Sequence, residues 1–249
     1  MSHHIVEIRE LSFAYPDGTA ALHSVNFTIR HGESVALVGA NGAGKSTLLL
    51  HMIGHLMPQT GSVQMGDFRV SPETASLIRR TVGMVFQDPD DQLFMPTVAD
   101  DVAFGPLNMG LPRNDIEARV EQSLQTVGAG HLKDRPPYRL SGGEKRRVAI
   151  ASVLAMSPDI LVMDEPTSSL DPQSRRRLIA LLREFHHTKI IATHDLDMAF
   201  ALCDRTIILH SGRVSADGRT AEIFQNDRLL AESGLERPLS MQGCPACSR

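Results

Sequence analysis

A glycine-rich stretch has the residue types and spacing of a phosphate site. Residues 39 to 46 fit the pattern G-x-x-x-x-G-K-[ST] in full, directly after the apolar run Ser34–Val38. A helix is predicted to begin at Lys45 and to end near Met57, and this strand-to-helix context is the one that the pattern needs. Glycines let backbone N–H groups point at phosphate oxygens, and the helix N-terminus adds a favourable dipole. A simple glycine turn is the alternative, which the complete motif disfavours.

Individual residues of this phosphate loop have predicted roles. The amine of Lys45 can reach the β- and γ-phosphates of a nucleotide, and the Ser46 hydroxyl can ligate Mg²⁺. The predicted nucleotide-binding residues of the loop and the position after it are Gly39, Ala40, Asn41, Gly42, Ala43, Gly44, Lys45, Ser46 and Thr47.

An acidic pair follows a second buried strand. Four apolar residues, Ile160–Met163, precede Asp164 and Glu165. Ligands bind at the carboxyl ends of strands in α/β sheets, so Asp164 is predicted to hold Mg²⁺ through its water shell. Glu165 could polarise an attacking water. Capping of the next turn is the alternative for both residues. With the phosphate loop, this pair indicates a nucleoside triphosphate and Mg²⁺, without choosing among kinase, GTPase, helicase and transporter.

The stretch Leu140-Ser141-Gly142-Gly143-Glu144 provides a more specific signal. Ser141 and Glu144 have the spacing of a capping box at a helix start, which is the structural interpretation. The two glycines also leave backbone N–H groups available to a second anion. Two anion sites on one chain suggest two chains that share nucleotides head to tail.

At these residues the sequence resembles the ATP-binding cassette (ABC) family, over nearly the whole chain. The resemblance implies that Ser141–Gly143 close on the γ-phosphate held by a partner subunit. It further implies that Gln87 contacts Mg²⁺ and water, and that Asp171 lies in the loop crossing the dimer interface. His194 matches the histidine that contacts the γ-phosphate, and Tyr15 the aromatic residue that stacks on adenine. Glu165, His194 and Gln87 are thus the expected catalytic residues.

A narrower resemblance, to ATPases of energy-coupling-factor importers, lies in residues 86–94, 98–106 and 140–151. It implies a transmembrane coupling subunit, a substrate-binding membrane subunit and a second ATPase copy, identical or paralogous. The short stretch after residue 220 is similar to that of cobalt or nickel import ATPases. The alternatives are the ATPase of a vitamin importer, such as one for biotin, a soluble ABC ATPase in assembly or repair, and a regulatory module without turnover.

The alternation of strands and helices predicts an α/β fold, a P-loop NTPase core with a mainly parallel central sheet. An N-terminal antiparallel β subdomain and an inserted α-helical subdomain complete the expected architecture. The predicted ABC domain covers residues 1–235, with the helical insertion at about 90–157. Residues 236–249 have no periodicity and are expected to form a flexible tail.

Composition restricts the location and the partners. The chain has 249 residues and a net charge of -4, so attraction to nucleic acid is not expected. No apolar run approaches the ~20 residues that span a bilayer, and the N-terminus lacks the features of a secretory signal. The expected location is peripheral, on the cytoplasmic side of the inner membrane. Cys203, Cys244 and Cys247 do not suggest disulfides, and the C-terminal pair lacks the four ligands of a zinc site.

An apolar cluster beside three aspartates is a candidate docking surface. Leu93, Phe94, Met95, Pro96 and Val98 follow the acidic stretch 88–91. An apolar surface with an acidic rim suits an amphipathic helix bearing basic residues. Phe94 and Met95 are expected to be exposed, since aromatic residues and methionine are favoured at interfaces. Packing of the helical subdomain is the alternative, above all for Leu93 and Val98.

Overall fold

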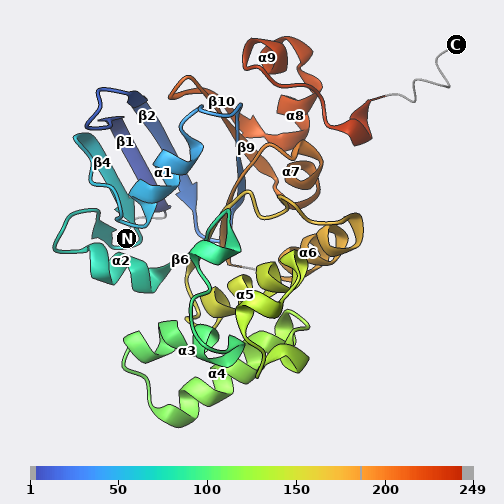
Figure 1. Cartoon of the computed structure of the whole chain (residues 1–249). Coiled ribbons are helices and arrows are strands. Elements are labelled where there is room, and N and C mark those ends of the chain that lie inside the picture. Colours follow the sequence, from blue (N-terminus) through green and yellow to red (C-terminus); the bar gives the residue numbers. More distant parts are fainter. Residues whose placement is uncertain (1–3, 186, 243–249) are drawn as a thin grey trace, which may run out of the picture. The chain divides into compact units, whose positions relative to one another are not determined.

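The computed structural model describes residues 4–185 and 187–242, so Cys244 and Cys247 lie outside the described residues. The chain divides into two compact units (Figure 1). The first unit comprises residues 1–78 and 187–249, and the second comprises residues 79–186. In the described part of the chain, no helix is both long and apolar enough to cross a bilayer.

An antiparallel sheet forms the N-terminal part of the first unit. Its strands lie in the order β2-β1-β4-β5, and β1, β2 and β4 are side by side in Figure 1. Buried and open positions alternate along much of β2, where Val25, Phe27 and Ile29 enter the core, the pattern of a sheet with one covered face. The strands are β1 (His4–Ala14), β2 (Ala20–Arg30), β4 (Thr60–Met65) and β5 (Phe68–Arg69).

The remaining strands of the first unit lie in the order β10-β9-β3-β8. Strand β3 is parallel to both β8 and β9, and β10 returns antiparallel to β9. The turn at Ser211-Gly212 joins β9 to β10, with both residues in the left-handed region that tight hairpin turns use. These strands are β3 (Ser34–Val38), β8 (Thr188–Thr193), β9 (Arg205–His210) and β10 (Arg213–Arg219).

Helices and short turns complete the first unit. Helix α1 ends at Met52, five residues before the predicted end near Met57. The cause is Gly54, which adopts the left-handed conformation (φ 63°) that ends many helices. The N–H groups of His55 and Leu56 then donate to the Leu50 carbonyl, at 2.9 and 3.1 Å. The elements are α1 (Lys45–Met52), α7 (Leu196–Leu202), α8 (Thr220–Gln225), α9 (Asp227–Glu232) and the 3-10 helix η4 (Leu239–Met241).

The second unit consists of two parallel strands, β6 and β7, and a group of helices. Helices α3, α4 and α5 pack on one another, and one face of α4 turns inward, with Ile116, Val120 and Leu124 buried. The α/β fold class with a helical insertion is therefore confirmed. Helix α2 (Ala75–Thr81) spans the boundary between the units. The other elements are β6 (Val82–Val85), β7 (Ile160–Asp164), α3 (Val98–Asn108), α4 (Arg113–Thr126), α5 (Gly142–Leu154), α6 (Pro172–Glu184), η1 (Pro89–Asp91), η2 (Gly130–Leu132) and η3 (Pro137–Arg139).

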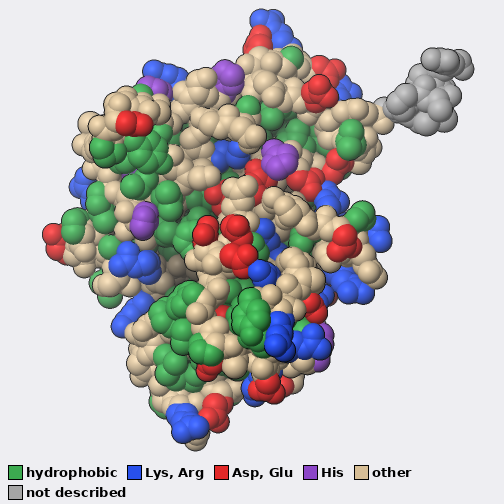
Figure 2. Space-filling view, viewed as in Figure 1, with side chains coloured by type: hydrophobic (Ala, Val, Ile, Leu, Met, Phe, Trp, Pro, Cys, Tyr) green, Lys and Arg blue, Asp and Glu red, His purple; other side chains and the backbone are tan. Residues whose placement is uncertain are grey.

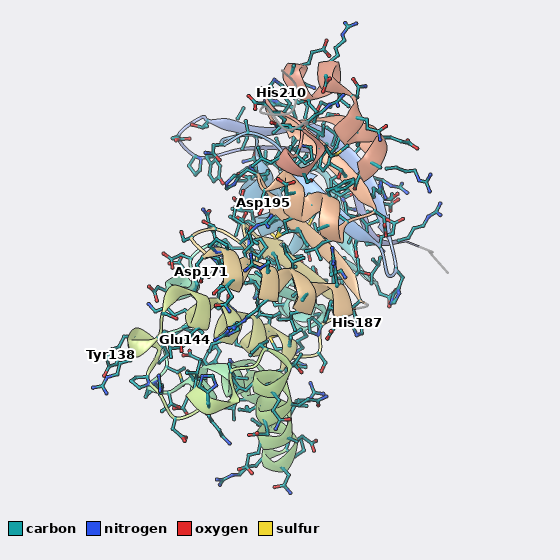
Figure 3. The ribbon with its side chains drawn as sticks, turned by 90° about the vertical axis from the view of Figure 1, so that its right-hand side faces the viewer. Tyr138, Glu144, Asp171, His187, Asp195 and His210 are labelled. Atoms are coloured by element: carbon teal, nitrogen blue, oxygen red, sulfur yellow. The ribbon has the colours of Figure 1, made fainter. Side chains whose placement is uncertain are left out.

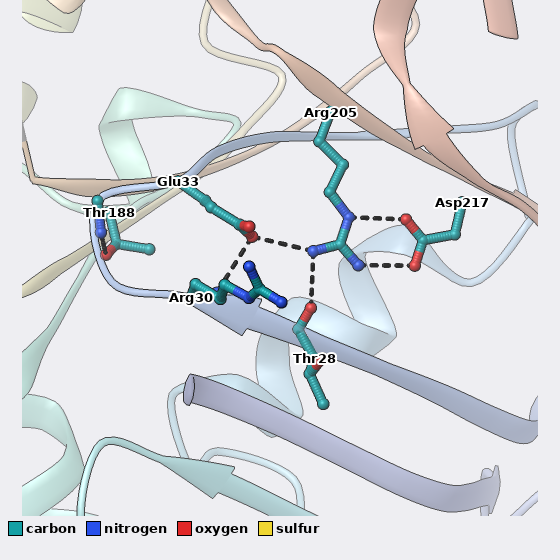
Figure 4. A network of polar contacts seen from close by, with 7 residues as sticks. Thr28, Arg30, Glu33, Thr188, Arg205 and Asp217 are labelled. Atoms are coloured by element: carbon teal, nitrogen blue, oxygen red, sulfur yellow. Dashed lines mark hydrogen bonds and ion pairs between the residues drawn. The ribbon is translucent and has the colours of Figure 1, made fainter. Parts of the chain in front are cut away.

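A polar network around Arg205 links the two sheets of the first unit (Figure 4). The guanidinium binds the Asp217 carboxylate through two hydrogen bonds of 2.7 Å. It also donates to Glu33 Oε2 at 2.9 Å and to the Thr28 carbonyl at 2.8 Å. Glu33 in turn accepts from the Arg30 N–H at 3.1 Å. One side chain on β9 therefore holds the end of β2, the turn before β3 and the hairpin strand β10.

Replacing Arg205 with methionine is expected to destabilise the protein. The substitution leaves Asp217 and Glu33 without a cation, and hydrogen bonds to charged groups contribute about 1.5–3 kcal/mol. Urea unfolding would measure the loss. The matched control is Arg113→Met, which breaks an exposed pair with Glu117 whose expected contribution is at most about 0.5 kcal/mol. Equal unfolding midpoints for the two variants would contradict the role given to Arg205.

Candidate nucleotide site

The phosphate loop connects β3 to α1, as the sequence predicts, and two of its glycines are required by their surroundings. A Cβ at Gly39 would lie 2.3 Å from the Leu209 carbonyl oxygen. At Gly44 the backbone has φ 101°, and a Cβ would lie 2.7 Å from the Ala21 carbonyl oxygen. A side chain at either position would collide with backbone, so glycine is needed for the loop to reach this conformation.

The polar side chains of the loop lie at the start of α1. Lys45 is buried, and its Nζ donates to the carbonyl oxygens of Gly39 and Ala40, at 2.8 and 3.2 Å. The lysine side chain therefore folds back over the loop, and its charge lies beside the backbone that is predicted to bind phosphate. Ser46 is exposed, while Thr47 faces the interior. The exposed loop residues are Ala40, Asn41 and Gly42.

Strand register brings His194 to the phosphate loop. Val38 pairs with Thr193 in the parallel β3–β8 ladder, so Gly39 and His194 are the next residues at the same sheet edge. The His194 side chain is exposed there. Parallel pairing thus places a histidine beside the loop without any sequence proximity.

Tyr15, the predicted adenine contact, is joined to helix α1. Its hydroxyl and that of Thr47 are 2.9 Å apart in a hydrogen bond. The Tyr15 ring meets Phe13 edge to face at a centroid distance of 5.1 Å, and Phe13 meets His51 in the same way at 4.7 Å. His51 Nδ1 lies 2.8 Å from the Thr47 carbonyl oxygen. The predicted base-binding residue and the helix after the phosphate loop therefore share one packed cluster.

In the second unit, a second register match aligns the other candidate residues. Val85 pairs with Met163 in the parallel β6–β7 ladder, so Gln87 and Glu165 each lie two positions beyond the paired residues. Gln87 is exposed, whereas Asp164 and Glu165 are each only 5% exposed. The backbone of Glu165 has φ 45°, a strained conformation for a residue with a side chain. The sequence contains no signal of that conformation.

The predicted capping box at the start of α5 is confirmed. Ser141 N–H donates to Glu144 Oε2 at 2.8 Å, and Glu144 N–H donates to Ser141 Oγ at 3.4 Å. The Ser141 hydroxyl also donates to Glu144 Oε2 at 2.8 Å, and the two hydrogen bonds that Ser141 donates hold the pKa of Glu144 below its usual value. In Figure 3, Glu144 lies in the first turn of α5, and Tyr138 projects into solvent just before it. Ser141 and Gly142 are exposed, so the motif is accessible to a partner.

Asp171 caps the next helix of the second unit. Its Oδ1 accepts from the N–H groups of Gln173 and Ser174, at 2.8 and 3.0 Å, at the start of α6. The hydrogen bonds from Ser174 are the main reason that the pKa of Asp171 is lowered. Asp171 is therefore the N-cap of α6, with Pro172 at the first helical position, and its carboxylate is exposed (Figure 3).

Sequence reasoning missed three residues that hold the Gln87 segment. Arg146 is buried and donates to the carbonyl oxygens of Phe86 and Gln87, at 2.7 and 2.6 Å. Lys145 forms a 2.6 Å ion pair with Asp90. Gln92 accepts from the Phe86 N–H and donates to the Ala149 carbonyl. The run of three basic residues after Glu144 was the feature of the sequence that could have indicated these contacts.

A pocket of about 520 Å³ lies beside this segment, lined by Gln87–Asp91, Leu140, Gly142, Lys145, Arg146 and Ser168–Leu170.

The donor set is suitable for Mg²⁺. This ion prefers oxygen ligands and is usually held by one or two carboxylates together with substrate phosphates, rather than by an all-protein cage. Ser46, Gln87 and Asp164 offer a hydroxyl, an amide and a carboxylate oxygen. Within residues 4–185 and 187–242, no three His, Cys, Asp or Glu side chains gather into a group that could hold a metal.

Comparison with known proteins identifies the family. Residues 22–168 match the family model described as ABC transporter. The chain belongs to the ABC transporter family. A protein of Geobacter sulfurreducens, named as an ABC transporter ATP-binding protein, is 68% identical over the full length of both chains. The energy-coupling factor transporter ATP-binding protein EcfA of Methanothermobacter thermautotrophicus is 47% identical, covering 94% of this chain and 77% of its own.

Solved structures agree with this assignment. The structure of cbiO1 from Clostridium perfringens, described as part of the ABC transporter complex cbiONQ, has a TM-score of 0.82 and 41% identity. The match covers 93% of this chain and 94% of that one. A dimeric post-hydrolysis structure of the ATP-binding cassette MJ0796, bound to ADP and Pi, has a TM-score of 0.78 and 28% identity, with coverages of 86% and 98%. The prediction of an ABC ATPase is thus confirmed, as is the resemblance to the energy-coupling-factor type.

Buried His51 makes the stability of the first unit depend on pH. Burial is the main cause of its lowered pKa, which falls below the usual 6.5 despite backbone hydrogen bonds that oppose the shift. A base with a depressed pKa takes up protons more readily in the unfolded chain, so stability is full above pH 6.5 and declines as the pH falls below it.

We expect His51→Asn to flatten this pH dependence. The asparagine amide can still donate to the Thr47 carbonyl, but it does not titrate. Melting temperatures measured from about pH 8 to pH 5 would compare the two proteins, with the exposed His210→Asn as the control. A decline below pH 6.5 that is equally steep in His51→Asn and wild type would show that another group causes it.

Proposed function

We propose that this ABC ATPase binds ATP·Mg²⁺ at residues 39–47 and couples its hydrolysis to import of a transition-metal ion, cobalt or nickel, through membrane subunits. The observation that carries the proposal is the complete phosphate loop at the carboxyl end of β3, with His194 brought beside it by the Val38–Thr193 register. That geometry suits a bound triphosphate. Because the chain belongs to the ABC transporter family, we infer that the energy of ATP hydrolysis is used for transport.

The proposed chemistry divides among residues of both units. Tyr15 offers an aromatic face to adenine, and Lys45 neutralises phosphate charge. Glu165 orients and deprotonates the attacking water, the role of a positioned carboxylate base. His194 and Gln87 are the proposed contacts to the γ-phosphate and to the water. The exposed Asp171 is proposed to approach the second ATPase copy.

Mg²⁺ is part of this proposal as the partner of the nucleotide. Ser46, Gln87 and Asp164 would hold the ion, directly or through its water molecules. When bound, it neutralises charge that develops on the phosphates. Because only one of these three groups is a carboxylate, the ion would bind weakly without ATP.

A dimer of ATPases is proposed because the second anion site, Ser141–Gly143, is accessible, with Ser141 and Gly142 exposed and Gly143 half-buried. The backbone N–H groups at the start of α5 would bind the γ-phosphate held by the phosphate loop of a second copy or a paralogue. The dimeric form of the ATP-binding cassette with ADP and Pi supports this arrangement. The proposed location is the cytoplasmic face of the inner membrane, where membrane subunits hold the two copies.

An exposed apolar patch on the second unit is the proposed docking surface for the transmembrane coupling subunit. Phe94, Phe104 and Leu107 are 63%, 41% and 56% exposed, and hydrophobic side chains gather over α3 in Figure 2. The rings of Phe94 and Phe104 meet edge to face at 5.0 Å. Both N–H groups of the Phe94-Met95 turn donate to Asp101 Oδ1 at 3.0 Å, which fixes the turn. Leu93 and Val98 are buried, as the packing alternative expects.

The occupant of this patch is proposed to be an amphipathic helix with basic residues. The neighbouring pocket is lined by Asp88, Asp90 and Asp91 and also by Lys145 and Arg146. Because Lys145 already pairs with Asp90, Asp88 and Asp91 are the carboxylates that give the surface its acidic side. Exposed apolar patches rimmed by polar groups are typical of protein interfaces. A basic helix would bury the phenyl rings and place its positive charges against these carboxylates.

The choice of a metal ion as the transported substrate is supported by kinship. The chain is similar at 41% identity to cbiO1, described as part of the ABC transporter complex cbiONQ. Its stretches at residues 86–94, 98–106 and 140–151 resemble ATPases of energy-coupling-factor importers, a group that brings in vitamins and transition metals. An ATPase does not contact the transported ligand, so the substrate is inferred from similarity to other ATPases alone.

Glu165→Gln is expected to keep ATP binding and to lose most hydrolysis. Loss of a positioned base lowers turnover by ~10²–10⁴-fold. Phosphate release by the assembled complex and uptake of radioactive cobalt or nickel by cells should both collapse. Sedimentation with ATP·Mg²⁺ should show the variant as a dimer, because the bound nucleotide is not hydrolysed.

The control for this experiment is Glu184→Gln, which removes a carboxylate at the end of α6. Turnover of Glu165→Gln near that of the control would show that Glu165 is not the base. Biotin uptake in place of metal uptake by the wild-type complex would assign the chain to a vitamin importer.

Phe94→Ala is expected to weaken association with the membrane subunits at least tenfold, because truncating an aromatic anchor costs about 1–2 kcal/mol or more. Folding and ATP binding should be unchanged, since the ring is mostly exposed. Pull-down of the membrane complex and a melting curve of the free subunit would test both. Leu239→Ala is the control, as Leu239 is 76% exposed on η4 in the first unit. Pull-down equal to the control, or a collapsed melting temperature, would contradict the docking role.

A further inference from the structure

Arg146 joins two segments of the second unit that have separate tasks in the proposed function. One segment is the start of α5, where Ser141–Gly143 face a partner's nucleotide. The other is the segment after β6, which carries Gln87 toward the chain's own nucleotide. Arg146 lies in the second turn of α5, and its two terminal nitrogens donate to the carbonyl oxygens of Phe86 and Gln87, at 2.7 and 2.6 Å.

The chemistry of this contact favours arginine over an apolar side chain. Arg146 is only 3% exposed, and removing a charge from water is costly unless hydrogen bonds replace the lost hydration. Its planar fork spans two consecutive carbonyl groups, which a lysine ammonium cannot do in a bidentate manner. The contact therefore fixes the direction of the backbone at Gln87, and with it the origin of the Gln87 side chain.

Two further contacts hold the same segment against α5. Lys145 pairs with Asp90 at 2.6 Å. The Gln92 amide accepts from the Phe86 N–H at 3.2 Å and donates to the Ala149 carbonyl and Ser152 Oγ, at 2.7 and 2.9 Å. Of these contacts, those of Arg146 alone reach the backbone of Gln87 itself. Arg146 thus contacts the backbone of Gln87 directly, while Lys145 and Gln92 bind the residues on either side of Gln87.

We propose that Arg146 is a positioning residue for Gln87, which makes the Gln87 segment and the Ser141–Gly143 helix move as one body. The inference rests on the proposed function, since it assigns Gln87 to the chain's own nucleotide and Ser141–Gly143 to that of the partner. A shift of Gln87 on binding ATP is then transmitted through the guanidinium to the helix that closes on the second nucleotide. The same link orients Gln87 for hydrolysis.

The variant Arg146→Met tests this proposal in the full complex, with Arg119→Met as the matched control. Arg119 also donates to a backbone carbonyl next to α5, that of Ala155 at 3.0 Å, but at the opposite end of the helix from Gln87. We expect both variants to bind ATP like wild type, because the phosphate loop lies in the first unit. Turnover should fall about 10- to 100-fold in Arg146→Met and stay near wild type in Arg119→Met.

A double-mutant cycle separates positioning from general stability. If Arg146 acts through Gln87, Arg146→Met should lower turnover little further in a Gln87→Ala background. Amide hydrogen exchange should rise in the peptide covering residues 86–92 of Arg146→Met, and not in Arg119→Met. Arg146→Lys should restore part of the turnover, and it serves as the test variant if Arg146→Met does not fold.

Additive losses in the cycle, or unchanged exchange at residues 86–92, would overturn the proposal. So would equal turnover of Arg146→Met and Arg119→Met at matched melting temperatures. Failure of the proposed function has a different signature, in which wild type and Glu165→Gln release phosphate at the same rate. Hydrogen exchange then still reports whether Arg146 holds the Gln87 segment.

Discussion

The register of two parallel strand pairs is the constraint on which the candidate site depends. In the first unit, the pairing of Val38 with Thr193 brings the phosphate loop and His194 to one sheet edge. In the second unit, the pairing of Val85 with Met163 does the same for Gln87 and the Asp164-Glu165 pair. Strands β7 and β8 are buried along their whole length, and register is strongly specified where strands are buried.

Hydrogen bonds to the backbone then shape the segments beyond the strand ends. Lys45 bonds the loop carbonyls of Gly39 and Ala40, Asp171 bonds the first N–H groups of α6, and Arg146 bonds the carbonyls beside Gln87. Loops that lack a repeating hydrogen-bond pattern must satisfy their polar groups in this way. Lys45 and Asp171 therefore shape the local backbone in addition to their proposed contacts with nucleotide and partner, whereas Arg146 acts on the backbone alone.

The residues proposed to bind the nucleotide and those proposed to contact partner subunits lie mostly in different units, which suggests how an ATPase could drive a membrane partner. The first unit carries the phosphate loop, Tyr15 and His194, which would hold the nucleotide. The second carries Gln87, the exposed α5 start and the Phe94–Phe104 patch, which under the proposed function would contact a nucleotide, a second ATPase and a membrane subunit. Because Arg146 and Asp101 fix the segments that bear Gln87 and Phe94, small shifts at one surface can reach the others as rigid displacements.

Local patterns in the sequence were sufficient to predict the phosphate loop, the buried strands and the α5 capping box. Each depends on residues a few positions apart, whose preferences act within one turn or one strand. The order of the motifs was also enough to recognise the ABC family. The boundaries of the ABC domain and the catalytic roles of Glu165, His194 and Gln87 stay predictions.

Other features were decided by contacts between residues far apart in the sequence. Arg146 meets carbonyl groups 59 and 60 positions away, and Arg205 meets Thr28 at a separation of 177, so no local pattern contains either bond. Packing buries Leu93 and leaves Phe94 exposed, although both are apolar. Gly54 ends α1 early, and Glu165 adopts a left-handed backbone. Residue type dictates which bonds a side chain can make, but the tertiary structure alone selects the partners, because burial removes the competing water.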